Sequence, residues 1–530
     1  MRYDQEYLSI PNVVRRAAET YGDAPALVDG PDGATRWSFR ELERQMLRAV
    51  RAALALGIAP GDRVGVCAPN SAEWIVAALA VQGAGGVVVP LNTRFKAAEL
   101  AYILRKSGAK ALFAVPFLGT DYVAELRKYD PESPALRTTV AVGGERGGVD
   151  LGWQDFLAKG ETVDESAAQA AIDRVTPDSA SDVMFTSGTT GHPKGVVLTH
   201  GQSLRAYGWM AEEYTFRAGD VFLVVPPFFH CFGYKAGWLA SFLHGVTVVP
   251  MAVFDAGRAL EIIDRERVSV MLGPPTIFLD LIAAPTRARH DTSSLRISMT
   301  GGTTIPEQLI HAMKDELSFD IVMSAYGLTE ASALATTTRL GDTPATVSRT
   351  NGRQIPGVEV RVADDAGKPV AVGDTGEIHV RGYTVTSGYW DDPEATSAAI
   401  HDDGWLRTGD IGSLDADGNL AVVDRKKDMF IVGGFNAYPA EIERLLLGYG
   451  PVAEAAVIGV PDERLGEVGC AYVVLRPGEN ITAQDIVAWS RANMANFKVP
   501  RHVRFVGHLP RNASRKVLKH ELRAAYEGDA

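Results

Sequence analysis

Amphipathic segments and short apolar runs alternate along most of the chain. Residues 42–56 and 98–107 repeat apolar positions at helical spacing, whereas residues 64–68 and 87–91 are short apolar runs. The first pattern predicts helices with one buried face, and the second predicts strands that are buried on both faces of a sheet. The same alternation returns in the segments 221–225, 246–250, 259–267, 268–272 and 305–317. Helices and strands in this order predict an α/β fold built in layers.

The C-terminal part of the chain has a different pattern. From about Gly357, short alternating runs are separated by turn-forming residues, which predicts a strand-rich subdomain. Two helices and two strands are predicted further on, at residues 439–447, 483–494, 455–460 and 470–475. Residues 428–530 carry 12 basic and 12 acidic side chains, so the whole net charge of -12 lies in the rest of the chain. We therefore predict a large N-terminal domain, residues 1–426, and a small α+β C-terminal domain, residues 427–530.

The composition is that of an ordinary globular protein with more than one domain. The chain of 530 residues exceeds the size at which single cores stop growing, and its 46% hydrophobic and 22% charged residues exclude disordered, collagen-like and coiled-coil classes. The negative net charge argues against a nucleic-acid-binding surface spread over the whole protein. Glycines and Pro90 interrupt the apolar stretch 74–91, so this stretch predicts a buried helix and a strand rather than a membrane span.

Cysteine usage and the amino-terminal residues favour a cytoplasmic location. Cys67, Cys231 and Cys470 are odd in number and far apart, which predicts neither a disulfide framework nor a zinc site. The first residues lack a basic region followed by an apolar one, and they predict an amphipathic helix with Pro11 in its first turn rather than an export signal. We expect no nucleic acid or integral membrane contact, and the oligomeric state stays open, with a homodimer among the options.

The strongest candidate for chemistry is the segment DVMFTSGTTGHPKGVVLTH, residues 182–200. An apolar strand enters a loop that gathers hydroxyls, glycines and one lysine, namely Thr186, Ser187, Gly188, Thr189, Thr190, Gly191 and Lys194. Glycines let backbone amides approach phosphate oxygens, hydroxyls donate further hydrogen bonds, and lysine adds positive charge, so the segment predicts a polyphosphate-binding loop. Lys194 stands between Pro193 and Gly195, which differs from the Walker A loop.

Five further motifs follow in order: YGLTE from Tyr326, TGD from Thr408, DRKKD from Asp424, GGFN from Gly433 and PRNASRK from Pro510. Together with the loop, they resemble the signature motifs of the adenylate-forming superfamily, which includes acyl-CoA and aryl-CoA synthetases, adenylation domains of peptide synthetases and luciferases. The resemblance covers nearly the whole chain. It implies an AMP-binding N-terminal domain and a mobile C-terminal domain. It also implies a two-step reaction, in which a small-molecule carboxylic acid attacks ATP to give acyl-AMP and pyrophosphate, and the acyl group then passes to CoA.

The resemblance implies how the phosphates are held. The β- and γ-phosphates are bound by the loop residues 186–191 together with Lys194. Thr329 contacts the α-phosphate. Glu330 helps to hold Mg²⁺, for which a carboxylate is a suitable hard ligand. Two anions must meet in the first step, so lysines and Mg²⁺ are needed to screen their charge.

The resemblance also implies how the rest of the nucleotide is held. Tyr326 stacks on adenine, while Gly301 and Gly302 line the base and acyl sites. Asp410 accepts hydrogen bonds from the ribose hydroxyls, with Arg425 nearby.

Residues of the predicted C-terminal domain complete the expected site. Lys516 is expected to reach the oxygens between the carboxylate and the α-phosphate during adenylation. Arg515 departs from the family pattern, in which Gly usually precedes this lysine. The domain is expected to rotate about Lys427 between the two half-reactions, bringing Gly433 and Gly434 beside the CoA pantetheine.

The acyl pocket is expected around an aromatic-rich motif. His230 in VVPPFFHCFGYKAGW matches a histidine that lies beside the acyl group in related CoA ligases, and the competing interpretation is a core histidine. Lys235 is expected either to pair with a polar oxygen of a bulky substrate or to cap a surface. The run FFHCFGYKAG resembles bacterial ligases that activate the propanoate side chain left after partial steroid breakdown.

Three functional hypotheses follow. The leading one is an AMP-forming acid:CoA ligase that uses ATP, Mg²⁺ and CoA. The second keeps adenylation with another acceptor or acid, such as an amine, a carrier-protein thiol or nitrite adenylated for diazotisation. The third is a nucleotide-binding protein whose catalysis has decayed, with Arg515 as its sign.

Overall fold

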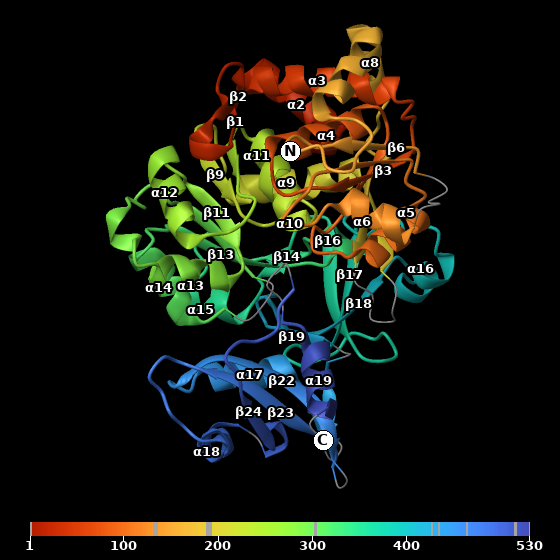
Figure 1. Cartoon of the computed structure of the whole chain (residues 1–530). Helices are drawn as coiled ribbons and strands as arrows, with labels where there is room; N and C mark the ends of the chain where they lie inside the picture. The colour runs from red at the N-terminus through yellow and green to blue at the C-terminus, as the bar shows by residue number, and fades with distance from the viewer. Residues whose placement is uncertain are drawn as a thin grey trace.

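Four β-sheets organise the computed structural model (Figure 1). It describes residues 3–130, 136–186, 193–301, 305–425, 428–432, 435–462, 465–494, 496–512 and 517–528.

The two largest sheets are mainly parallel and belong to the N-terminal part. The nine-stranded sheet has the order β15 (Arg353–Gln354), β14 (Thr336–Thr337), β13 (Ile321–Tyr326), β12 (Ile297–Thr300), β11 (Val270–Gly273), β9 (Val221–Val224), β10 (Thr247–Pro250), β1 (Pro25–Asp29), β2 (Thr35–Ser38). The six-stranded sheet has the order β6 (Thr138–Ala141), β5 (Ala111–Ala114), β3 (Arg63–Cys67), β4 (Val87–Pro90), β7 (Ala180–Thr186), β8 (Lys194–Thr199). Their central strands are short apolar runs buried on both faces, as the sequence predicts.

The other two sheets are smaller. An antiparallel four-stranded sheet is formed by β16 (Val358–Ala363), β17 (Gly376–Gly382), β18 (Leu406–Leu414) and β19 (Leu420–Arg425). It is the strand-rich subdomain predicted from Gly357 onward. The C-terminal sheet contains β20 (Phe430–Val432), β21 (Phe435–Ala437), β22 (Val452–Asp462), β23 (Gly466–Leu475) and β24 (His502–Phe505).

Helices cover the faces of these sheets. In the N-terminal part they are α1 (Tyr3–Tyr7), α2 (Ile10–Tyr21), α3 (Phe39–Ala55), α4 (Ala72–Gly83), α5 (Ala97–Ser107), α6 (Tyr122–Tyr129), α7 (Trp153–Lys159), α8 (Glu165–Asp173), α9 (His200–Glu213), α10 (Cys231–Gly233), the π-helix η3 (Tyr234–Leu239), α11 (Ala240–Leu243), α12 (Ala256–Glu266), α13 (Pro275–Ala283), α14 (Glu307–Asp315), α15 (Pro344–Arg349) and α16 (Pro393–Ala399). The C-terminal part has α17 (Pro439–Leu447), α18 (Ala483–Asn493) and α19 (Lys519–Gly528). Short 3₁₀ turns are η1 (Pro31–Gly33), η2 (Gly160–Thr162), η4 (Arg287–Arg289), η5 (Thr329–Ala331) and η6 (Asn496–Lys498).

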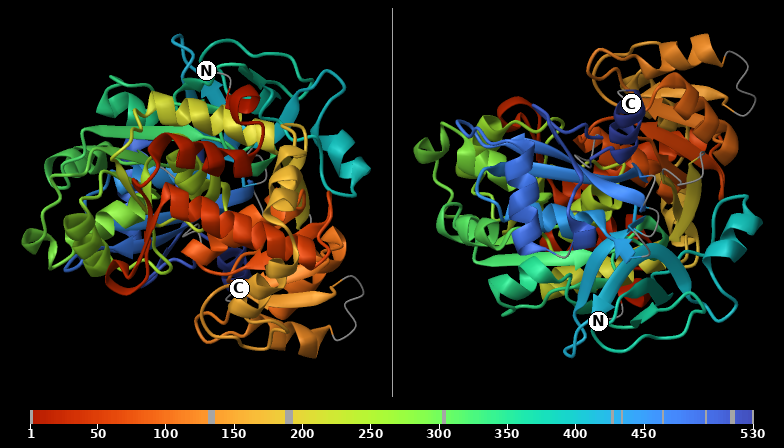
Figure 2. Two further views of the ribbon diagram at one scale, coloured as in Figure 1. Left: turned by 90° about the horizontal axis from the view of Figure 1, so that it is seen from above. Right: turned by 90° about the horizontal axis from the view of Figure 1, so that it is seen from below.

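Helix α4 lies in the core between the two large sheets. It is apolar around almost its whole circumference, contacts β3 and β4 of one sheet and β1 of the other, and is buried over nearly its full length. A helix without a polar face needs such surroundings on all sides. Helices α2 and α3 lie outside it and cover the face seen from above in Figure 2. The predicted order of helix and strand in residues 74–91 is therefore confirmed.

The C-terminal elements have a hydrophobic core of their own. Figure 1 shows them in blue beneath the N-terminal sheets. Apolar side chains from α17, β22 and β23, among them Ile442, Val457 and Ala471, pack together in this core. The helices predicted at residues 439–447 and 483–494 and the two strands between them are all present, with β22 and β23 longer than predicted. No helix in the described part of the chain combines the length and hydrophobicity that crossing a membrane requires.

A buried ion pair connects the two large sheets. Lys235 of the π-helix, which packs on β9, lies with its Nζ 3.1 Å from Oδ1 of Asp182 on β7, and both side chains are fully buried. Lys235 also donates a hydrogen bond of 2.9 Å to Oγ of Ser203 on α9. The expectation that Lys235 meets a substrate oxygen or caps a surface is therefore wrong. An internal carboxylate satisfies its charge, as burial of a charge requires.

The pair gives the first prediction. Lys235→Met leaves the Asp182 carboxylate buried without a counter-charge, which should cost about 3–5 kcal/mol of folding free energy. The double variant Asp182→Asn, Lys235→Met contains no unpaired charge and should unfold at a higher temperature than the single variant. Thermal denaturation followed by circular dichroism measures both. Lys128→Met, which removes an exposed pair with Glu125, is the control and should change stability by less than about 1 kcal/mol. Equal melting temperatures for Lys235→Met and the wild type would contradict the prediction.

Candidate active site

The predicted phosphate loop leaves and re-enters the six-stranded sheet as a hairpin. Thr186 at the end of β7 pairs with Lys194 at the start of β8 in an antiparallel ladder. The strands therefore place the threonine hydroxyl and the lysine at the two ends of the same loop. Ser187, Gly188, Thr189, Thr190 and Gly191 lie outside the described residues.

The irregular segment 384–390, which follows β17, lies against the edge strand β8 and forms an isolated bridge with it. Val197 donates its backbone N–H to the Gly388 carbonyl at 3.1 Å, and Trp390 donates to the Gly195 carbonyl at 2.6 Å. Gly388 has φ 143°, and a Cβ at this position would lie 2.8 Å from the Thr396 side chain. Glycine is therefore required there, and the segment fixes the strand that carries Lys194.

The same segment is bonded on its other side to the YGLTE turn. Thr386 donates its backbone N–H to the Glu330 carbonyl at 2.8 Å, and the Ser332 hydroxyl donates to the Thr384 carbonyl at 2.9 Å. The turn contains η5, which includes both Thr329 and Glu330. Residues 384–390 thus join the exit of the phosphate loop to the predicted metal-binding turn.

Tyr389 lies between the two predicted charged residues. The Nζ of Lys194 is 5.2 Å from the centroid of its ring, and its hydroxyl donates a hydrogen bond of 3.0 Å to Oε1 of Glu330. Burial, together with the negative charge of Glu330, raises the pKa of Tyr389, so the hydroxyl stays protonated as a donor. Sequence reasoning missed this residue, and the aromatic pair Tyr389 and Trp390 after a glycine was its only visible signal.

The YGLTE turn is held in a strained backbone conformation. Ser332 and Ala333, which follow it, have φ angles of 53° and 58°. The chain folds back so tightly that a Cβ on Gly327 would lie 2.2 Å from the Ala333 carbonyl carbon. Consecutive non-glycine residues with positive φ are costly and gather at functional sites.

Tyr326 and Asp410 meet, although they come from different sheets. Tyr326 ends β13 and donates its hydroxyl to Oδ2 of Asp410 on β18 at 2.7 Å, and both side chains are largely buried. A bulge between β17 and β18 shapes the TGD turn, in which the Gly409 amide donates to Glu377 and the Asp410 amide donates to the Thr408 hydroxyl. The structure therefore brings together two of the predicted nucleoside-binding residues.

Two further predicted residues flank this pair. Gly301 follows β12, and a Cβ there would approach the carbonyl of Ala325, the neighbour of Tyr326, to 3.4 Å. The backbone of Arg425 pairs with that of Asp410 across β18 and β19. Gly302 lies outside the described residues.

His230 lies in a turn that a buried asparagine holds. The Asn70 amide donates to the carbonyls of Val224 and Pro226, and its oxygen accepts from the Phe228 amide. His230 caps α10 by accepting the Phe232 amide at its Nδ1. The side chain is exposed, so the competing interpretation of a core histidine is wrong.

The turn of His230 lies near the Glu330 carboxylate. Desolvation by the surrounding protein lowers the pKa of His230, which favours a neutral ring. Burial raises the pKa of the neighbouring Cys231 to about 12, with Asp182 and Glu330 adding to the increase against an opposing effect of Lys235.

The remaining predicted residues belong to the predicted C-terminal domain. Lys427, Gly433, Gly434, Arg515 and Lys516 lie outside the described residues. Among the residues that are described, no group of three or more histidine, cysteine, aspartate or glutamate side chains could hold a metal ion by itself.

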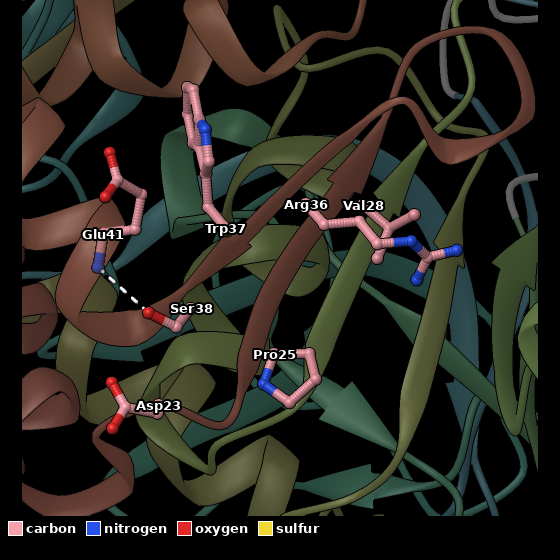
Figure 3. A pocket seen from close by; sticks show the side chains of 7 residues that line it. All are labelled: Asp23, Pro25, Val28, Arg36, Trp37, Ser38 and Glu41. Carbon is pink, nitrogen blue, oxygen red and sulfur yellow. Dashed lines mark hydrogen bonds between the residues drawn. The ribbon is translucent and has the colours of Figure 1, made fainter.

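A surface hollow beside β2 is separate from this arrangement. Figure 3 shows its lining and the N-cap hydrogen bond from the Glu41 amide to the Ser38 hydroxyl, 3.2 Å long. It is lined by Asp23, Pro25, Val28, Arg36, Trp37, Ser38 and Glu41. None of these is a predicted site residue, and β2 is the far edge strand of the nine-stranded sheet.

Comparison with known proteins identifies the family. The profile of the AMP-binding enzyme family matches residues 14–390, and that of the AMP-binding enzyme C-terminal domain matches residues 441–516. The chain belongs to the AMP-binding enzyme family. The expectation drawn from its motifs is confirmed, and the AMP-binding fold accounts for the large sheets and the separate C-terminal unit.

Curated relatives and solved structures cover the chain almost completely. The chain is 47% identical over 521 residues to the 3-[(3aS,4S,7aS)-7a-methyl-1,5-dioxo-octahydro-1H-inden-4-yl]propanoyl:CoA ligase of Rhodococcus jostii (strain RHA1), covering 97% of this chain and 98% of the relative. It is 47% identical over 517 residues to the ligase of the same name from Mycobacterium tuberculosis, with the same coverage. The crystal structure of the anthranilate CoA ligase AuaEII in complex with anthranoyl-AMP is 27% identical, with a TM-score of 0.87 over 98% of both chains. This AMP-binding enzyme is an AMP-forming acyl-CoA synthetase.

The contact between Tyr326 and Asp410 gives the second prediction. Tyr326→Phe removes a hydrogen bond to a carboxylate that is largely buried, and the KM for ATP should rise about 10-fold because Asp410 loses its fixed orientation. Steady-state kinetics of acyl-CoA formation at varied ATP measures the change. Tyr449→Phe, which changes a tyrosine stacked on Trp489 in the C-terminal core, is the matched control. A KM for ATP that is the same in Tyr326→Phe and the control would contradict the role of this contact.

Proposed function

We propose that this AMP-binding enzyme activates the propanoate side chain of a fused bicyclic ketone. The main support is the 47% identity over 97% of the chain to two ligases whose names specify such an acid. The aromatic-rich turn of His230 supports the same conclusion, because it combines an exposed imidazole with the partly exposed rings of Phe229 and Phe232. A bulky apolar acid with few polar atoms suits a wall of this composition.

The charges of the site suit the first half-reaction. The acid carboxylate has to approach a triphosphate of the same sign, so positive charge must be placed near both. Lys194 starts the strand that follows the predicted phosphate loop, and its ammonium lies over the Tyr389 ring. We assign it to the phosphates, together with the hydroxyls and amides of residues 186–191. The Thr329 hydroxyl, in the adjacent turn, is assigned to the α-phosphate.

The residues around Glu330 fit a Mg²⁺ ion that arrives with the nucleotide. Magnesium is usually bound in proteins through one or two carboxylates together with substrate phosphates, rather than by a cage of protein ligands. Glu330 offers one carboxylate, and its Oε1 is already held by Tyr389. When bound, Mg²⁺ would neutralise charge that develops on the phosphates. The task of the protein at this position is to keep the carboxylate in one orientation.

Tyr326 and Asp410 suit the nucleoside. The tyrosine ring is assigned to adenine and the Asp410 carboxylate to the ribose hydroxyls, with Gly301 leaving room beside the base. The 2.7 Å hydrogen bond between the two side chains would keep these two subsites at a constant separation. His230 is assigned to the acyl wall, where a neutral ring adds no charge beside an apolar substrate.

The C-terminal domain would supply the remaining groups. We assign residues 1–426 to the AMP-binding domain and residues 427–530 to a mobile domain that turns about Lys427. Lys516 is proposed to act in adenylation, and Gly433 and Gly434 are proposed to approach CoA in the second step. The three cysteines are buried free thiols. This pattern suits a reducing compartment, and we propose a cytoplasmic location.

The third prediction concerns the acid. With ATP, Mg²⁺ and CoA, fused bicyclic propanoates should give kcat/KM values at least about 100-fold above those of straight-chain acids of equal carbon number. A straight chain lacks the contacts that several ring atoms would make with the acyl pocket. The formation of AMP, pyrophosphate and thioester measures turnover for each acid. Omission of CoA should stop sustained turnover. Higher activity on straight-chain acids would contradict the proposed substrate, and equal turnover without CoA would contradict the acceptor.

The fourth prediction separates the half-reactions. Lys516→Ala should slow acyl-AMP formation by at least about 100-fold, because it removes a positive charge from converging anions. Thioester formation from preformed acyl-AMP should change less than about 3-fold, since that step does not bring the carboxylate and triphosphate together. Single-turnover measurements of each step provide the test, with Lys519→Ala as a nearby control. An equal loss in both steps would contradict the assignment.

A further inference from the structure

We propose that Tyr389 is a positioning residue that keeps Lys194 and Glu330 from neutralising each other. The proposal rests on the roles assigned above to the lysine and the glutamate. Tyr389 touches both, with its ring face toward the ammonium and its hydroxyl on the carboxylate. The two charged side chains, both in the described part of the chain, contact Tyr389 and form no ion pair with one another.

The backbone leaves Tyr389 little freedom to move. The residues on either side of it are bonded to β8, through Gly388 to Val197 and through Trp390 to Gly195. Its own amide donates to the Thr396 hydroxyl at 2.9 Å. Through Thr386 the same segment is bonded to the Glu330 carbonyl. The ring is therefore anchored relative to the strand of Lys194 and to the turn of Glu330 at once.

The chemistry of the side chain suits a separator between opposite charges. The face of an aromatic ring carries partial negative charge, so it attracts the lysine ammonium without consuming its hydrogen-bond donors. The protonated hydroxyl holds one oxygen of the Glu330 carboxylate and leaves the other available. A site for a magnesium-bound triphosphate needs both charges unpaired with each other. The ammonium has to meet phosphate oxygens, and the carboxylate has to meet the metal.

Loss of the ring should allow the two charges to meet. A long flexible lysine next to a partly buried carboxylate is expected to form a direct ion pair when nothing separates them. That pair would compete with phosphate for Lys194 and with Mg²⁺ for Glu330. Replacement of the hydroxyl alone should act differently, because the ring still stands between the charges while the carboxylate becomes free to rotate.

The fifth prediction uses direct ATP binding, measured by isothermal titration calorimetry on the full chain. In EDTA, Tyr389→Leu should weaken ATP binding about 10-fold, which corresponds to about 1.4 kcal/mol. The second change Glu330→Gln in this background should restore most of the lost affinity, because it removes the competing anion. In a double-mutant cycle, Glu330→Gln must raise the ATP affinity of Tyr389→Leu by a larger factor than it raises the ATP affinity of the wild type. A merely structural loss would not be repaired by a change at Glu330.

The companion variant Tyr389→Phe should keep wild-type ATP affinity in EDTA and raise the Mg²⁺ concentration for half-maximal ATP binding about 10-fold, the size expected for one hydrogen bond to a charged group. Tyr383→Leu is the matched control. Its ring faces Arg205 at 3.7 Å in the same part of the chain, and its ATP affinity and Mg²⁺ dependence should stay within about 2-fold of the wild type. Melting temperatures show whether each variant is folded, and if Tyr389→Leu does not fold, the magnesium titration of Tyr389→Phe decides.

Three results would overturn the proposal. They are unchanged ATP affinity in folded Tyr389→Leu, a loss that Glu330→Gln does not restore, and an unchanged magnesium dependence in Tyr389→Phe. Parallel variants test the underlying roles separately. Lys194→Ala should weaken ATP binding in EDTA, and Glu330→Gln should weaken the magnesium dependence. If either parent variant behaves like the wild type, the assigned role of that residue fails. If both respond and the Tyr389 variants do not, only the inference about Tyr389 fails.

Discussion

Hydrogen bonds from one irregular segment determine how the strand of Lys194 and the turn of Glu330 lie relative to each other. Residues 384–390 follow the small antiparallel sheet, yet they pair with β8 of the six-stranded sheet and bond to the turn that follows β13 of the nine-stranded sheet. The bonds from Val197 to Gly388, from Trp390 to Gly195 and from Thr386 to Glu330 use main-chain groups only, which side-chain changes alter little. The strand that carries Lys194 and the YGLTE turn are therefore held in a fixed position relative to each other, because both are hydrogen-bonded to the same segment.

A buried ion pair also connects the two large sheets. Taking Lys235 and Asp182 out of water carries a large desolvation cost that their attraction repays only with good geometry and further hydrogen bonds. Ser203 provides one of these bonds to the lysine, and Ser181 donates another to the carboxylate. An apolar pair could stabilise the layers as well. The ion pair, however, also specifies which side of the π-helix faces β7.

Much of the architecture could be predicted from the sequence because it depends on local patterns. Runs such as Val87–Pro90 and the continuous apolar surface of α4 specify burial by themselves, and they appear as predicted. The pairing of Thr186 with Lys194 likewise follows from a strand, a glycine-rich loop and a second strand. The contact of Tyr326 with Asp410 joins distant segments, and only the order of the motifs indicated it.

Lys235 and Tyr389 show what local pattern omits. An isolated lysine in an apolar run suggests a substrate partner or a surface position, because the sequence gives no sign that Asp182 lies opposite it across two sheets. Tyr389 belongs to no helix or strand, and its importance arises when residues around it pair with β8. In both cases the decisive neighbour is set by how the sheets are packed against each other, which the periodicity of a single segment does not encode.

A site for a polyanion and its metal faces a general electrostatic difficulty. It needs a cation for the phosphates and an anion for the metal within a few ångströms, yet such charges attract each other strongly in a partly buried setting. Separating them by distance would spoil the geometry, and surrounding each by charged partners would consume the groups that must bind ligand. An aromatic ring with a hydroxyl keeps the two charges close without letting them pair. It attracts the cation weakly through its face and donates a single hydrogen bond to the anion. In this protein Tyr389 lies between Lys194 and Glu330, with its ring toward the ammonium and its hydroxyl on the carboxylate, and this is the arrangement on which the proposed separation of the two charges rests.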